Sequence, residues 1–125
     1  MDLIYLRITH GIGAGLIVKG HLVTGAHGFA GEVGHLRIGP SGPLCPRCGA
    51  RGCLEASASE RAIKRELGVV FGVADPDMLD LNELLQSPSS HPAVKHAIWE
   101  AGWNVGSALA QTANLLDPEW VVLGG

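Results

Sequence analysis

The sequence lacks the features of a membrane-spanning, secreted or nucleic-acid-binding chain. No apolar run approaches the roughly 18 to 20 residues that a helix needs to cross a bilayer. Residues 1–125 contain no stretch typical of a secretion signal. Lys and Arg number 9 against 12 Asp and Glu, and the resulting net charge of −3 leaves no concentrated basic face for a phosphate backbone. We therefore expect DNA to be contacted only through a domain outside these residues.

The composition is that of an ordinary globular chain, with 46% hydrophobic and 17% charged residues in a length of 125. Met1 leads directly into a strand-like segment, and the apolar run at 121–123 ends in Gly124-Gly125. We read these ends as those of a piece of a longer protein, forming a single domain over residues 1–125.

The first third of the chain reads as strands and glycine-rich turns. Residues 3–9 alternate in the manner of a β-strand, further strands are expected at 16–18 and 21–23, and a short one at 36–38. Between the first two lies a glycine loop, His10–Gly15. Its glycines, Gly11, Gly13 and Gly15, either expose backbone N–H groups to an anion such as a phosphate or simply permit a tight turn.

The rest of the chain is expected to be helical until its last strand. Ser57 to Glu60 matches the S-x-x-E capping box and predicts a helix over 58–67 that stops at Gly68. Asp80 caps a short helix to Gln86, 87–91 form a linker, and the longest helix spans 92–116 before a strand at 120–123. Trp99 and Trp103 lie on one flank of that helix, where we favour burial over a role in an interface. The pattern indicates an α/β fold.

All three cysteines lie in the stretch from Glu32 to Glu55, which is rich in Pro and Gly. Cys45 and Cys48 have C-x2-C spacing, and Cys53 and His35 complete a set suited to a structural Cys3His zinc site. Zinc would hold together a loop that cannot bury a core of its own. The alternatives are ordinary buried thiols, or a disulfide with one free thiol, although the cysteine count is odd. Zinc thiolates without a secretion signal indicate a cytoplasmic location.

Gly-Glu-Val-Gly-His at 31–35, followed by Cys45 and by Cys-Gly-Ala-Arg-Gly-Cys-Leu-Glu at 48–55, resembles the signature of the ROK family of repressors, uncharacterised open reading frames and sugar kinases. The segments GIGAGLIVKG and LLDPEWVVLGG resemble further ROK segments in the expected order, so the likeness covers essentially the whole chain. The resemblance implies the C-terminal lobe of an actin-like, ribonuclease H-like fold. We expect the family's N-terminal lobe, with its D-x-G motif and catalytic aspartate, to lie outside these residues.

The resemblance also implies roles for individual residues. His35, Cys45, Cys48 and Cys53 match zinc ligands. Glu32, His35 and Glu55 match residues that hydrogen-bond sugar hydroxyls, so His35 serves both sites. Gly11, Gly13 and Gly15 match a loop near the nucleotide phosphates of the kinases, Gly124-Gly125 matches a turn near the adenosine, and family members are commonly oligomers.

The chain departs from the family pattern in three places. These departures bear on the choice between two candidate functions. The first thiol pair is one residue longer than the usual C-x-C because of Pro46-Arg47; His10 stands where kinases carry the Thr of G-T-G; and Ala58-Ser59-Glu60 replaces A-S-G. We favour the sugar-sensing and oligomerisation lobe of a transcriptional regulator, with a sugar or sugar phosphate as ligand. The alternative is the lobe of a sugar kinase, with ATP and Mg²⁺ as further cofactors. No catalytic base can be nominated.

Overall fold

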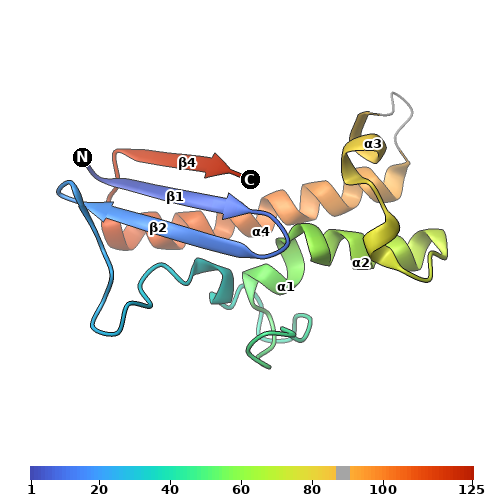
Figure 1. Ribbon diagram of the computed structural model, residues 1–125, viewed down its shortest axis with the longest axis horizontal. Helices are drawn as coiled ribbons and strands as arrows, with labels where there is room; N and C mark the ends of the chain where they lie inside the picture. The colour runs from blue at the N-terminus through green and yellow to red at the C-terminus, as the bar shows by residue number, and fades with distance from the viewer. Residues whose placement is uncertain (87–90) are drawn as a thin grey trace.

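A four-stranded sheet with helices packed against one face organises the structure (Figure 1). The computed structural model describes residues 1–86 and 91–125. Strand order is β3-β2-β1-β4, and the strands are β1 (Leu3–Ile8), β2 (Ile12–Val18), β3 (His21–Leu22) and β4 (Trp120–Gly124). The helices are η1 (Val33–His35), α1 (Leu54–Ala58), α2 (Glu60–Phe71), η2 (Pro76–Met78), α3 (Leu81–Gln86) and α4 (Pro92–Leu116). The predicted α/β fold is confirmed.

The strand pairing follows from the connections. A tight turn joins β1 to β2, which pair antiparallel with Ile8 opposite Ile12. β4 pairs parallel with β1, Leu3 lying opposite Trp120, and every helix of the described chain lies in the crossover between them. Leu6 of β1 points to the helices and is fully buried, whereas its neighbours Tyr5 and Arg7 point to the exposed face.

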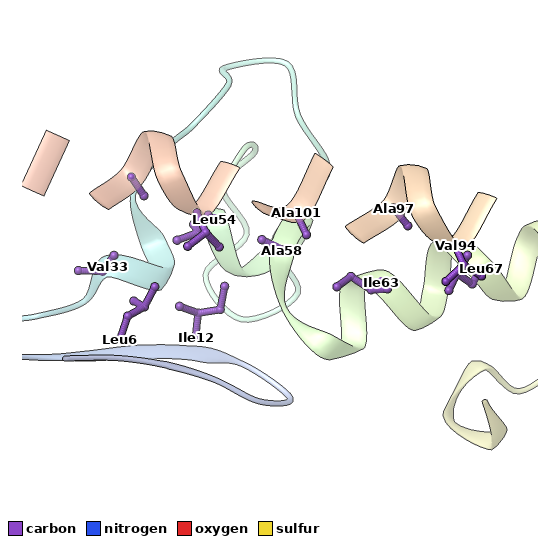
Figure 2. Close-up of a cluster of buried hydrophobic side chains, with 12 residues drawn as sticks. Leu6, Ile12, Val33, Leu54, Ala58, Ile63, Leu67, Val94, Ala97 and Ala101 are labelled. Carbon is purple, nitrogen blue, oxygen red and sulfur yellow. The ribbon is translucent and has the colours of Figure 1, made fainter. Parts of the chain in front are cut away.

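The core lies between the sheet and the helices, as Figure 2 shows. Leu6 and Ile12 come from the sheet, Leu54 from α1, and Leu67 from α2. α4 contributes one buried face at helical spacing: Val94, Ala97, Ala101, Val105, Ala108 and Thr112. Small residues dominate that face, which lets the long helix lie close to its neighbours. No helix within the described ranges is long and apolar enough to span a membrane.

The capping signals were predicted in part. Asp80 accepts from the Glu83 N–H at 3.2 Å, and Pro92 occupies the first turn of α4, both as expected. The Ser57 capping box was wrong: Ser57 lies inside α1, and Ser59 caps α2 by accepting from the Ala62 N–H at 3.1 Å. Ser59 takes an extended conformation that ends α1 and begins α2.

Gly68 does not end α2, as had been predicted. The helix continues to Phe71 and stops at Gly72, whose φ of 66° is the left-handed C-cap conformation. Gly68 is buried against Pro76, where an added Cβ would stand 3.2 Å from the ring Cγ. It is therefore a packing glycine.

Three other expectations were wrong. Residues 36–38 form no strand, because Arg37 makes only an isolated bridge with Cys53. The glycine loop is shorter than expected, since Gly13 and Gly15 belong to β2. Trp99 and Trp103 are 63% and 65% exposed and stack on each other, with ring centroids 5.7 Å apart. They are four positions apart along α4, so both rings lie on the same, exposed side of the helix. The predicted linker at 87–91 lies outside the described residues except for His91, the N-cap of α4.

Candidate functional site

Four potential metal ligands converge from separate parts of the Glu32–Glu55 stretch. His35 ends η1, Cys45 and Cys48 lie in the following loop, and Cys53 is the N-cap of α1. One ligand atom from each residue lies within 4.8 Å of all the others. The structure therefore brings together the whole set of residues that the sequence singled out as zinc ligands.

The loop between these ligands is held by backbone hydrogen bonds and two glycine conformations. The Cys45 N–H donates to the Ala50 carbonyl at 2.7 Å, and the Gly49 N–H donates back to the Cys45 carbonyl at 2.9 Å. Gly49 and Gly52 have φ values of 77° and 82°, which other residues rarely adopt. With these backbone conformations the Cys48 and Cys53 thiols lie 3.5 Å apart.

The spacing of the ligand atoms fits a tetrahedral zinc ion. Zn–S bonds of about 2.3 Å and Zn–N bonds of about 2.0 Å give tetrahedral edges of about 3.8 Å between two sulfurs and about 3.5 Å between sulfur and nitrogen, and both edges here lie within a few tenths of an ångström of these values. Cys48 Sγ lies 3.5 Å from Cys53 Sγ, and Cys45 Sγ lies 3.8 Å from His35 Nδ1. All three cysteines are free, so no disulfide accounts for their approach. Four protein ligands would complete the coordination sphere of the zinc ion. Such a site is structural, because no coordination position is left open for catalysis.

The pKa values of two of the thiols are shifted in opposite directions. Burial raises the pKa of Cys53 to about 12, helped by the neighbouring Cys48 and Cys45 thiols. Burial also opposes ionisation of Cys45, but hydrogen bonding to the backbone of Cys48 and Arg47 outweighs it and lowers the pKa of that thiol. Three crowded sulfurs cannot all carry charge without a cation, and a zinc ion would supply one.

His35 faces two ways. Its Nδ1 lies toward Cys45 Sγ, while its Nε2 lies 4.0 Å from Oε2 of Glu32, one helical turn before it. The ring is therefore placed between the thiol cluster and an exposed carboxylate. A metal bound at Nδ1 would fix the ring orientation and leave Nε2–H to act as a donor on the other side.

Glu55 is the second carboxylate near this point, and it is 5% exposed. Its Oε1 accepts from the Ile12 N–H at 2.9 Å and from Arg47 Nη1 at 3.3 Å. With Glu32 it lines an open cavity of about 330 Å³, which lies at the small end of the range for ligand sites. The other lining residues are Arg7, Thr9, Gly11, Ile12, Gly13 and Arg47.

The β1–β2 turn is shaped to fit Glu55. A Cβ at Gly11 would overlap Oε1 of Glu55, whereas a Cβ at Gly13 or Gly15 would meet no atom within 4 Å. Gly11 therefore makes room for the carboxylate. Gly13 and Gly15 extend along β2, and their predicted contact with a nucleotide phosphate stays a prediction.

Arg47 is the residue that sequence reasoning missed. It lies in the Pro46-Arg47 spacer, which is one residue longer than the usual C-x-C spacer and was treated only as a change in loop length. The structure places its guanidinium on the Glu55 carboxylate, at the rim of the cavity. No local signal in the sequence pointed to it, because the contact with Glu55 depends on the loop conformation.

Comparison with known proteins places the chain in a family. The ROK family model matches residues 1–125. The chain belongs to the ROK family. The chain is also 38% identical to a xylose repressor of Caldicellulosiruptor bescii, over 98% of this chain and 33% of the repressor. It thus spans about a third of the length of that ROK relative.

Solved ROK structures share its fold. The chain superposes on the ROK hexokinase of Thermus thermophilus with a TM-score of 0.86 and 37% identity, covering 99% of this chain and 40% of the hexokinase. It superposes on a ROK glucokinase of Streptomyces griseus, solved with glucose and AMPPNP, with a TM-score of 0.81 and 31% identity. The match covers 99% of this chain and 44% of the glucokinase. Both branches of the ROK family, regulators and kinases, are thus similar to this chain.

Proposed function

We propose that this chain is the zinc-containing, sugar-sensing lobe of a ROK transcriptional regulator of carbohydrate metabolism. The observation that carries the proposal is the placement of His35, with Nδ1 toward the thiol cluster and Nε2 toward Glu32. Zinc on the first nitrogen would aim the second at a sugar hydroxyl. Zinc is then a scaffold for the ligand pocket, and the bound sugar is the signal.

Glu32 and Glu55 are proposed to accept hydrogen bonds from neighbouring hydroxyls of that sugar. Carboxylates are strong acceptors, and Glu55 already has one oxygen held by the Ile12 N–H and Arg47. Its orientation is therefore fixed before a ligand arrives, which lowers the entropic cost of binding. The similarity to a glucokinase solved with glucose supports a sugar as the ligand class.

The wider organisation follows from the same proposal. Residues 1–125 would form the C-terminal lobe, with an N-terminal lobe and a DNA-binding domain elsewhere in the intact protein. The chain covers 33% of a xylose repressor, which is consistent with that arrangement. A cytoplasmic location and assembly into homo-oligomers stay predictions; light scattering coupled to size-exclusion chromatography tests the second.

A ROK sugar kinase is the second candidate, favoured by the 37% identity to a ROK hexokinase. In that case ATP and Mg²⁺ would bind beside the sugar, with Gly11, Gly13 and Gly15 near the phosphates. His10 weighs against it, because this side chain stands where the kinases carry a threonine hydroxyl. ADP release by the intact protein in the presence of ATP and glucose or xylose separates the two: a regulator releases none above background, and sugar-dependent release identifies a kinase.

Glu55→Gln tests the sugar site. Because the amide keeps the size of the carboxylate but loses its charge, we expect glucose or xylose to bind the intact protein about tenfold more weakly by calorimetry. Zinc content should not change. Glu83→Gln, which removes an exposed carboxylate on α3, is the matched control. Unchanged sugar affinity in Glu55→Gln would remove Glu55 from the site.

A further inference from the structure

Three further potential metal ligands meet where α2 and α4 pack together, and none of them belongs to the thiol cluster. Glu66 lies on α2, while His96 and Glu100 lie one turn apart on α4. One ligand atom from each residue lies within 4.8 Å of the other two. All three residues are exposed, so a cation can reach them from solvent. We call this group the helix-pair cluster.

The two carboxylates of the helix-pair cluster are incompletely balanced by positive charge. Within residues 1–86 and 91–125, Glu100 Oε2 pairs with His96 Nε2 at 3.4 Å, and Glu66 forms no ion pair. Arg65 is the cation next to Glu66 in sequence, but its Nη2 lies toward the Ala56 carbonyl at 3.5 Å. Two carboxylates this close to each other repel unless a cation lies between them.

Helix stability does not explain the pairing of His96 with Glu100. An acidic residue four positions before a basic one suits the helix dipole better than the reverse order, and here the carboxylate follows the imidazole. Their separation of 3.4 Å is longer than a typical N–H···O hydrogen bond of about 2.9 Å. A tetrahedral metal ion with bonds of about 2.1 Å, in contrast, holds its ligand atoms about 3.4 Å apart. The spacing therefore fits two ligands of one ion.

A cavity borders the helix-pair cluster. It measures about 480 Å³, and both Glu66 and Glu100 line it. Ser57 and Asn104 lie on the same lining, joined by a contact of 3.4 Å between the amide nitrogen and the hydroxyl. Three protein ligands leave at least one coordination position of a divalent cation open. The cavity has room for the water molecule or small anion that would fill it.

We propose that Glu66, His96 and Glu100 bind a divalent transition-metal cation that links α2 to α4. One imidazole with two carboxylates suits Zn²⁺, Ni²⁺ or Co²⁺ better than Mg²⁺, which prefers oxygen ligands alone. With no thiolate and full exposure, this ion would exchange with solvent. The two helices also meet in the core through Leu67 and Val94 (Figure 2), so an ion that links them adds to the stability of the folded chain.

Calorimetric titration of the intact, zinc-loaded protein with Ni²⁺ and with Mg²⁺ tests the proposal. We expect Ni²⁺ to bind at least tenfold more tightly than Mg²⁺ and to raise the melting temperature as its concentration increases. His96→Gln and Glu66→Gln should each weaken Ni²⁺ binding at least tenfold, because each removes one of three ligands. His27→Gln and Glu83→Gln, which replace exposed residues outside the cluster, are the matched controls and should leave the affinity unchanged.

The four replaced side chains are all exposed, and circular dichroism verifies that each variant folds. Zinc content measured after the titration shows that Ni²⁺ has not displaced the ion proposed at the thiols. Ni²⁺ that binds no more tightly than Mg²⁺ would overturn the proposal, as would an equal loss of affinity in the controls. Full affinity in Glu66→Gln would do the same, because binding by α4 alone indicates an adventitious ion only. None of these results depends on sugar binding, so the proposed function stands or fails separately.

Discussion

At the scale of single residues, several independent contacts hold the Glu55 carboxylate beside the Cys–His cluster. It is buried, accepts from the Ile12 backbone, pairs with Arg47 and fits against Gly11. A buried carboxylate is costly unless its acceptors are satisfied, and here one oxygen is held by two donors. The second oxygen is the one available for a ligand.

Gly11→Ala should disturb this arrangement, because the added methyl group would overlap Oε1 of Glu55. The carboxylate or the β1–β2 turn must shift, and overpacking of this kind costs about 1 to 3 kcal/mol of unfolding free energy. Gly15→Ala is the matched control, since its methyl group meets no atom within 4 Å and the strand tolerates it. Urea denaturation measures both variants. Equal stability of the two would contradict the account of the turn.

The identities of the candidate site residues were predictable, but their contacts were not. Cys45, Cys48, Cys53 and His35 followed from thiol spacing and the family signature, which are local in sequence. Arg47 and Gly11 acquire their roles only when the β1–β2 turn meets the N-terminus of α1, some forty residues away. Such long-range placement leaves no periodic signal in the sequence.

At the scale of elements, the junction of α1 and α2 connects the helices to the β1–β2 turn. Ser59 ends α1 and caps α2, and the Glu60 N–H donates to the Thr9 carbonyl at 2.9 Å. The helix pair is thereby tied to the turn that contacts Glu55.

Elements with strong periodicity, such as α4 and β1, were predicted closely. The α1–α2 boundary was misplaced because two serines two residues apart both suit a cap.

Ser59→Ala should cost about 1 kcal/mol of unfolding free energy, the usual loss when an N-cap hydroxyl is removed. Ser57→Ala should cost less, because Ser57 lies inside α1 and makes only long contacts, at 3.3 Å to the Leu54 carbonyl and 3.4 Å to Asn104. Thermal or urea unfolding of the two variants compares them directly. A larger loss for Ser57→Ala would restore the original capping assignment.

At the scale of the whole molecule, the described chain is built of two differently stabilised parts. The sheet and helices bury a continuous apolar cluster, while residues 39–52 contribute few apolar side chains and enclose a separate small cluster of Cys45, Cys53 and Ala56. The loop therefore depends on backbone hydrogen bonds and, in our proposal, on zinc. Loss of zinc would therefore loosen α1, whose N-cap is Cys53 and which carries both Leu54 and Glu55.

Removal of zinc should therefore lower the melting temperature by about 10 °C or more, since structural zinc contributes directly to folding free energy. Sugar affinity should fall with it, because His35 and Glu55 would lose their fixed positions. Differential scanning calorimetry before and after treatment with a zinc chelator measures the first effect. Restoration by added Zn²⁺ but not Mg²⁺ is the control. An unchanged melting temperature in protein shown to be metal-free would contradict a structural role.

Metal content is the most direct test of the central claim that one zinc ion links the thiol cluster to the ligand pocket through His35. Elemental analysis of freshly purified, folded protein should find close to one zinc ion per chain. The same measurement on Cys45→Ser should find much less. Folded protein with no zinc, or with a full complement of zinc in Cys45→Ser, would contradict the account.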